Sequence, residues 1–269
     1  MNEFQLNGWR HDLEDRIGLH AACKSTYLLR RFRGMELPKT VDPRDWLKVE
    51  NQGQIGSCQG NALSTAGEFA HKIATGDGTL QFSRHWCYIM SQRMDGIRGD
   101  NGSTLSGGQK VAHEYGFALE STVPYPDRYT STIPNEQKAK EEAKAYKIKT
   151  SIQCHTYQDV LEFIGNGFGG VQIGIAWPDS WMNAGETLES FRPGNGGHSV
   201  IFVGYTERPD AQGRAYLLLM NSWGKSWGNG GYAEVAPKAV EQMLAHNWTE
   251  MIGHTDMDNP APRRVKVQC

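Results

Sequence analysis

The amino-acid sequence predicts an α+β fold in which a mainly helical part comes first and a mainly β part follows. Three observations predict it. Apolar residues recur at helical spacing up to about residue 122, Pro124, Pro126 and Pro134 then mark a change of composition, and short runs of β-branched and aromatic residues follow. Because helices and strands are segregated rather than alternating, they indicate two lobes rather than repeated βαβ units. A cleft between two such lobes is a favoured place for a substrate site.

The helices are expected mainly in the first half of the chain. Gly53, Gly56 and Gly60 lead into a helix over Cys58–Ile73, which the Gly-Asp-Gly run at 76–78 ends. The other expected helices cover the ranges Leu19–Phe32, Ser83–Met94, Gly107–Tyr115, Asn135–Ala145, Tyr157–Ile164 and Val240–Trp248. The expected strands cover the ranges Val171–Trp177, Ser199–Thr206, Ala215–Asn221 and Gly231–Val235.

Four segments follow from this pattern: an extension over 1–36, a helical lobe over 37–122, a β lobe over 123–236, and a C-terminal extension over 237–269 that packs on the β lobe. Two interpretations of the first segment stay open. It is either a short pro-segment that lies in the cleft and is removed at the basic run Arg30–Arg33, or an ordered extension that braces the β lobe.

Composition excludes several classes of protein. The formal net charge is −2, with 38% hydrophobic and 22% charged residues, so there is no field that favours nucleic acid or an anionic membrane as a partner. No run approaches the ~20 apolar residues of a membrane-spanning helix. The first twenty residues carry eight charged or histidine side chains and no apolar core, so we expect a cytoplasmic protein. The oligomeric state is not indicated.

The five cysteines do not form a disulfide framework or a metal site in any pattern that the sequence displays. Their number is odd, they form no close pairs, and neither CxxC nor HExxH occurs. We therefore expect no metal and no cofactor. Cys23, Cys87 and Cys154 are interpreted as buried or incidental thiols, and at least one of the five thiols is expected to be kept for its chemistry.

Cys58 stands at the predicted start of a helix. The positive end of the helix dipole favours a thiolate there, and with an imidazolium nearby it can lower a thiol pKa from ~8.5 to roughly 3.5–7.5. Backbone N–H groups of the Gly-rich turn and the side-chain amide of Gln52 offer donors to an oxyanion. Taken alone, a buried structural cysteine explains the same turn equally well.

Two later motifs supply partners for that thiol. His198 follows Gly196-Gly197 at the start of an expected strand, 140 residues after Cys58. Asn221 follows another strand 23 residues later, and an asparagine there can accept a hydrogen bond from a histidine ring.

These motifs resemble the papain family of cysteine peptidases. Its Pro-x-x-Val-Asp opening is matched by Pro38–Asp42, its Asn-Gln-Gly and Gly-Ser-Cys block by 51–53 and 56–58, and its substrate loop by Asn101-Gly102-Ser103. The histidine strand is matched over His198–Tyr205, and the Asn-Ser-Trp-Gly-x-x-Trp-Gly…Gly-Tyr run over Asn221–Tyr232. The matched blocks stand in the family's order over about residues 37–236. The histidine lies in the interval of about 130–150 residues that papain-type enzymes show, and the asparagine falls beyond it.

The resemblance implies a papain-like two-lobe fold, with a helical first lobe, a β-barrel-like second lobe and the active site between them. It implies Cys58 as nucleophile, His198 as acid/base, Asn221 as orienter and Gln52 as side-chain oxyanion donor. The residues implied to bind the peptide substrate or shelter the site are Gly56, Asn101, Gly102, Ser103 and Trp223.

The chain also departs from the family's pattern. Gln59 stands where most members carry Trp, Ser103 where they carry Gly, Ile55 where they carry a disulfide cysteine, and Gly197 where Asp is common. These departures suggest a bacterial or viral branch that folds without disulfides.

The predicted function is hydrolysis of peptide bonds through a Cys58 thioester. Two alternatives stay open. The same acyl-enzyme can serve transpeptidation or cleavage of isopeptide or cell-wall peptides, and the chain can instead be an inactive binding module on the same scaffold.

Overall fold

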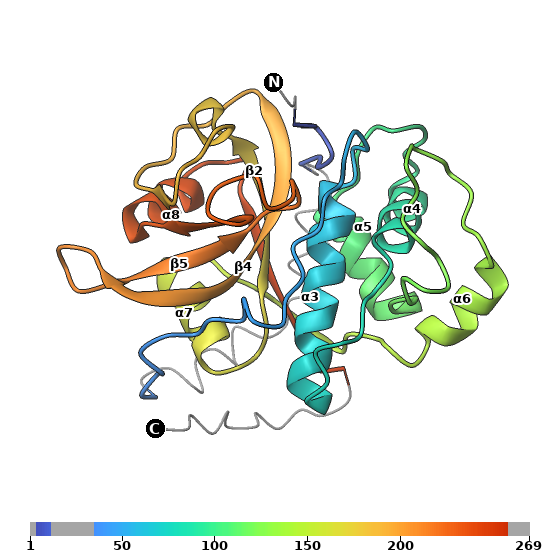
Figure 1. The fold of residues 1–269 in the computed structure, drawn as a ribbon, viewed down its shortest axis with the longest axis horizontal. Helices are drawn as coiled ribbons and strands as arrows, with labels where there is room; N and C mark the ends of the chain where they lie inside the picture. The colour runs from blue at the N-terminus through green and yellow to red at the C-terminus, as the bar shows by residue number, and fades with distance from the viewer. Residues whose placement is uncertain (1–3, 12–34, 258–269) are drawn as a thin grey trace.

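The computed structural model describes residues 4–11 and 35–257. The helix expected at Leu19–Phe32, the basic run Arg30–Arg33 and the cysteines Cys23 and Cys269 lie outside the described residues. Figure 1 shows helices α4, α5 and α6 gathered on one side of the molecule, a sheet with α7 and α8 on the other, and α3 running between them. This confirms the predicted α+β class and its two lobes.

The helices follow the sequence prediction closely. Their bounds are α3 Cys58–Thr75, α4 Arg84–Asp95, α5 Leu105–Lys110, α6 Glu136–Ala143, α7 Tyr157–Gly165 and α8 Pro237–Leu244. Side-chain caps start several of them, because the first N–H groups of a helix lack backbone partners. Ser83 accepts from the Trp86 N–H, and Thr156 forms a capping box with Asp159.

The helix predicted over Gly107–Tyr115 differs from expectation at both ends. Thr104 caps it through the Gly107 N–H, so α5 begins two residues before the expected Gly107. From Val111 to Tyr115 the chain continues as one π-helical turn, η1, which Gly116 ends at φ 85°. The last predicted helix begins at Pro237 rather than Val240 and ends at Leu244, because proline suits the first position of a helix.

A seven-stranded sheet forms the β part. The strands are β1 Thr150–Gln153, β2 Val171–Trp177, β3 Thr187–Leu188, β4 Gly196–Pro209, β5 Ala215–Met220, β6 Tyr232–Val235 and β7 Glu250–Thr255, and a short 3-10 turn, η2, covers Asp179–Trp181. Their order is β1-β7-β2-β4-β5-β6-β3. All pairs are antiparallel except β3 with β6.

Three strands of this sheet, β1, β3 and β7, were not predicted. β1 and β7 are only four and six residues long and mix polar with apolar side chains, so no clear alternation marks them. The predicted C-terminal extension in fact supplies β7, which lies inside the sheet between β1 and β2.

Packing of α3 on the sheet fixes the position of the site. Ala62 and Ala66 of the helix lie in one apolar cluster with Ile201 and Val203 of β4 and Met220 of β5. Small alanines let the helix approach the strands closely, and each fully buried large apolar side chain contributes about 1.5–3 kcal/mol. The first residue of α3 is thereby held against the start of β4.

A second apolar cluster belongs to the helical part. It includes Phe82, Trp86 and Phe117, and also Ala139 and Ala143 of α6. The helix α6 therefore packs with the helical part, although it follows the predicted boundary at residue 122. The division of the chain into 37–122 and 123–236 stays a prediction.

Candidate active site

The thiol of Cys58 is buried at the first turn of α3. The Ser199 backbone N–H donates to its Sγ at 3.3 Å, so the sulfur lies directly beside the residue that follows His198. Burial raises the pKa of the Cys58 thiol to about 12, although backbone hydrogen bonds from Ser199, Gln59, Cys58 and Gly8 oppose this. In this arrangement the thiol is therefore neutral.

His198 and Asn221 form a buried pair. His198 Nε2 and Asn221 Oδ1 are 2.8 Å apart, and the same Oδ1 accepts the Ser222 backbone N–H at 2.8 Å. Because an N–H can only donate, that contact identifies the Asn221 atom as the oxygen, and Nε2 must carry the proton. The lone pair of the neutral ring is then on Nδ1, which is buried and makes no hydrogen bond within the described residues.

Aromatic rings enclose the histidine. Trp223 stacks on it with ring centroids 4.5 Å apart, and Trp177 meets it edge-on at 4.7 Å. Burial among these rings lowers the pKa of His198 to about 4, against the opposing effect of the Asn221 hydrogen bond. Trp223 thus lies where the resemblance implied, whereas Trp177 carries no motif that predicts its role.

The Gln52 side chain is oriented by a contact that the sequence analysis missed. Ser222 Oγ donates to Gln52 Oε1 at 2.7 Å, and the Gln52 backbone N–H donates to the Ser222 carbonyl at 2.8 Å. The Gln52 Nε2 group is left to donate, and it does so to the carbonyls of Ile55 at 3.0 Å and Gln5 at 3.4 Å.

The loop Asn101–Ser103 lies on the helical side of the site. Gly102 has φ 74°, a conformation that favours glycine, and Gln92 Nε2 donates to its carbonyl at 3.0 Å. Ser103 Oγ donates to Gln59 Oε1 at 2.8 Å, and both residues are fully buried. Two departures from the family's pattern are therefore bonded to one another.

Gly56 is tied to the same loop. Its backbone N–H donates to Asp100 Oδ1 at 2.9 Å, and Tyr88 donates to that oxygen at 2.8 Å. The turn before Cys58 and the loop at 101–103 thus share one carboxylate.

Residues 4–11 lie directly over these groups. Phe4 stacks on Trp223 at 4.5 Å, and the Asn7 backbone N–H donates to the Gly197 carbonyl at 2.8 Å. Gly8 approaches the thiol so closely that a Cβ added to it would lie 2.7 Å from Cys58 Sγ.

The far end of the segment binds the Asn101–Ser103 loop. The Arg10 backbone N–H donates to the Ser103 carbonyl at 3.0 Å, and the Ser103 N–H donates to the Gly8 carbonyl at 3.3 Å. Arg10 Nε also donates to the Asn101 carbonyl at 2.5 Å. Every group that the sequence analysis assigned to peptide binding on this loop is thus beside, or bonded to, the chain's own N-terminal segment.

Trp9 is the apolar anchor of the segment. It is 2% exposed and clusters with Cys58, Leu105 and Ile252. Its ring covers Gly174, where any Cβ would lie 2.3 Å from the indole. No motif in residues 4–11 indicated this placement, because the contacts join parts of the chain about 50 to 240 residues apart.

The described residues 4–11 and 35–257 contain no cluster of histidine, cysteine or acidic side chains with the geometry of a metal site. Among them there is also no helix with the length and apolar character needed to cross a membrane.

A helix-borne thiol beside a strand-borne imidazole that an asparagine orients is the arrangement of a thiol-dependent hydrolase. Comparison with known proteins agrees. The family model described as "Papain family cysteine protease" matches residues 37–249. The chain belongs to the papain family of cysteine proteases and is a cysteine peptidase.

The relatives reported below share little more than a quarter of their aligned residues with this chain. An uncharacterized peptidase C1-like protein of Acanthamoeba polyphaga mimivirus is 28% identical over 233 residues, which cover 79% of this chain and 72% of that protein. Rat procathepsin L is 26% identical over 252 residues, covering 86% and 67%. Among solved structures, xylellain, a cysteine protease from Xylella fastidiosa, shares the fold with a TM-score of 0.73 at 20% identity, covering 95% of this chain and 98% of that one.

Proposed function

We propose that Cys58, His198, Asn221 and Gln52 carry out peptide-bond hydrolysis, and that residues 4–11 hold this site closed until they move away or are removed. The observation that carries the first part is the His198–Asn221 pair. It places the proton on Nε2 and leaves the lone pair of Nδ1 for a proton from the adjacent thiol.

The proposed reaction has two stages. The Cys58 sulfur gives its proton to His198 and attacks the substrate carbonyl carbon, while the Gln52 amide and the Cys58 backbone N–H donate to the oxyanion. His198 then protonates the leaving amine, and the peptide C–N bond breaks to leave a thioester. In the second stage His198 takes a proton from water, which attacks the thioester and returns the thiol.

Substrate backbone would bind where the N-terminal segment now does. The Gly56, Asn101, Gly102 and Ser103 backbone groups face that path, and the Trp223 ring that Phe4 covers would shelter the His198–Asn221 bond from water.

The pose of the segment explains why it blocks the site without being cleaved there. Acyl transfer requires the attacked carbonyl carbon and the stabilised oxygen to belong to one group. Here Gly8 is the residue against the sulfur, whereas the carbonyl that meets Gln52 Nε2 belongs to Gln5. No single peptide group of the segment meets both Cys58 and Gln52, so this supports the pro-segment interpretation over a simple brace.

The first experiment is intact-protein mass spectrometry after incubation of the full chain with the epoxide E-64 under reducing conditions. We expect one adduct on the wild type, one on Cys87→Ala as a buried-thiol control, and none on Cys58→Ala. An adduct that persists in Cys58→Ala would overturn the assignment of the nucleophile.

The segment is tested in the same assay with Gly8→Val. The added side chain would collide with Cys58 Sγ and with the Gly56 backbone, each 2.7 Å from the Cβ position, so the segment must lift. We expect faster adduct formation than in the wild type. Gly185→Ala is the matched control, because a Cβ there meets nothing within 4 Å. If the rate for Gly8→Val equals that of the control, the segment does not limit access.

A further inference from the structure

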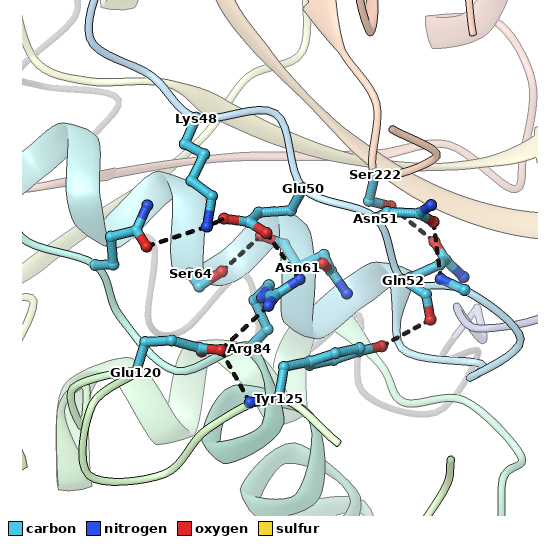
Figure 2. A network of polar contacts seen from close by, with 12 residues as sticks. Lys48, Glu50, Asn51, Gln52, Asn61, Ser64, Arg84, Glu120, Tyr125 and Ser222 are labelled. Carbon is cyan, nitrogen blue, oxygen red and sulfur yellow. Dashed lines mark hydrogen bonds and ion pairs between the residues drawn. The ribbon is translucent and has the colours of Figure 1, made fainter. Parts of the chain in front are cut away.

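The Tyr125 hydroxyl contacts both ends of the loop that precedes α3. Tyr125 Oη donates to the Gln52 carbonyl at 3.0 Å and lies 2.5 Å from Ser57 Oγ. Figure 2 shows the ring reaching from the Arg84–Glu120 pair to Gln52. One hydroxyl thus joins the residue that carries the side-chain donor to the residue before the nucleophile.

The donors and acceptors available at these atoms determine the direction of each hydrogen bond of the Tyr125 hydroxyl. The Gln52 carbonyl can only accept, so Tyr125 gives its single proton to it and must accept from Ser57 Oγ. Ser57 Oγ in turn accepts from Asn61 Nδ2 at 3.0 Å, and the same Nδ2 donates to the Ser57 carbonyl at 3.0 Å. The result is a single directed chain from Asn61 through Ser57 and Tyr125 to Gln52.

Charged groups fix the ring of Tyr125. The Arg84 guanidinium lies over its face at 4.1 Å, and Glu120 Oε1 accepts the Tyr125 backbone N–H at 2.9 Å. Arg84 itself is held by Glu120 at 3.1 Å and by Glu50 at 2.9 Å, and it is only 11% exposed (Figure 2). The Tyr125 ring is therefore held in one position by these contacts.

The loop between the two contact points also has hydrogen bonds of its own, including one from Gln52 Nε2 to the Ile55 carbonyl at 3.0 Å. Within it, the Ile55 N–H donates to the Gln52 carbonyl at 3.3 Å and the Ser57 N–H donates to the Ile55 carbonyl at 2.8 Å. The Gln52 side chain is oriented from the opposite side by Ser222, and the Gln52 carbonyl needs a second anchor if the amide is to keep its place.

We propose that Tyr125 is a positioning residue for the oxyanion donors, because it sets the separation between Gln52 and Cys58. The inference rests on the proposed function, which gives those two residues the donor roles. Oxyanion donors act at about 2.7–3.1 Å from the developing charge. Misplacement on the order of 1 Å can cost about 10²-fold in rate, and a smaller shift correspondingly less.

The test compares two rates on the full chain. One is kcat/KM for the peptidyl-coumarin substrate that the wild type cleaves best, which needs the oxyanion donors. The other is alkylation of Cys58 by iodoacetamide, a displacement at an sp³ carbon that forms no oxyanion on the peptide. Both require the N-terminal segment to move away, so their ratio cancels differences in opening.

We expect Tyr125→Phe to lower this ratio about 10-fold through kcat, with KM and the alkylation rate little changed. Ser57→Ala, which removes the donor to Tyr125, should lower the ratio in the same direction and serves if Tyr125→Phe does not fold. Gln52→Ala sets the scale, with a loss of about 10²-fold.

Tyr157→Phe is the matched control. Tyr157 also donates to a backbone carbonyl, that of Ala215 at 2.7 Å, and also has an arginine over its ring, but it lies in the sheet core. Equal ratios for Tyr125→Phe and Tyr157→Phe would overturn the inference while leaving the proposed function standing. A wild type with neither turnover nor alkylation of Cys58 would instead overturn the proposed function itself.

Discussion

The groups of the site and the segment that covers them are anchored in different ways. Cys58, His198 and Asn221 belong to α3, to β4 and to the end of β5, and these elements are joined by a common apolar cluster. Residues 4–11 form no helix and only an isolated bridge, and they are attached by backbone hydrogen bonds, the Phe4 stack and the buried Trp9 ring. The residues proposed for the chemistry are therefore held by the core, whereas access to them depends on a few separable contacts.

Removing the largest of those contacts should have the strongest effect on access to the thiol. We expect Trp9→Ala to raise the rate at which iodoacetamide alkylates Cys58 by about 10²-fold. Loss of a buried tryptophan side chain costs about 3–5 kcal/mol, and about 3 kcal/mol corresponds to two orders of magnitude in the opening equilibrium. Intact mass spectrometry over time measures the rate.

The control for this prediction is Trp46→Ala. Trp46 packs on Phe69 of α3, away from the segment, so its loss lowers stability without uncovering the thiol. A similar acceleration in both variants would mean that general destabilisation, and not release of the segment, exposes Cys58.

Opening of the N-terminal segment should also depend on pH. In the closed arrangement the pKa of His198 is lowered to about 4 and that of the Cys58 thiol is raised to about 12, both because of burial. When the segment leaves, both values return toward 6.5 and 9.0. Below about 6.5 the open form binds a proton that the closed form cannot, and above about 9 it loses one that the closed form keeps.

Opening should therefore become easier on both sides of a window from about pH 6.5 to 9, by up to about tenfold per pH unit. Hydrogen–deuterium exchange of the backbone amides of residues 4–11, corrected for the intrinsic pH dependence of exchange, measures it.

His198→Gln should flatten the acid limb, that is, the increase in opening below about pH 6.5. His11→Gln is the control, because His11 and Glu250 form a contact of 3.8 Å at the other end of the segment. If only His11→Gln flattens the acid limb, the switch lies at that contact.

The smallest expected effect concerns the framework under the substrate loop. The Gln59–Ser103 hydrogen bond joins α3 to the loop at 101–103, and both side chains are buried. In a double-mutant cycle of Gln59→Leu and Ser103→Ala, we expect a coupling of about 1 kcal/mol in the free energy of unfolding. Urea denaturation measures it. The cycle of Ser103→Ala with Tyr216→Phe, which lies in the β part, should give no coupling, and equal values in both cycles would contradict a specific bond.

Much of the fold was readable because its signals are local. The strand Val171–Trp177 is a mostly apolar run rich in β-branched and aromatic residues, and the helix that begins at Cys58 is preceded and followed by glycines. The strands β1 and β7 were not predicted, because each is short and is stabilised by pairing with distant strands rather than marked by an alternation of apolar and polar residues.

The family, the class of chemistry and the residue types proposed to carry it could be predicted from the sequence, because they follow from long motifs with fixed spacing. The positions of Phe4, Gly8 and Trp9 around the thiol site, and the contacts of Tyr125 and Ser222 with Gln52, became apparent only in the folded structure. These contacts join residues that are far apart in the chain, from Trp9 and Cys58 (58 − 9 = 49 positions) to Phe4 and Trp223 (223 − 4 = 219 positions). Such contacts have no local sequence pattern, and they exist only once α3 has packed against β4.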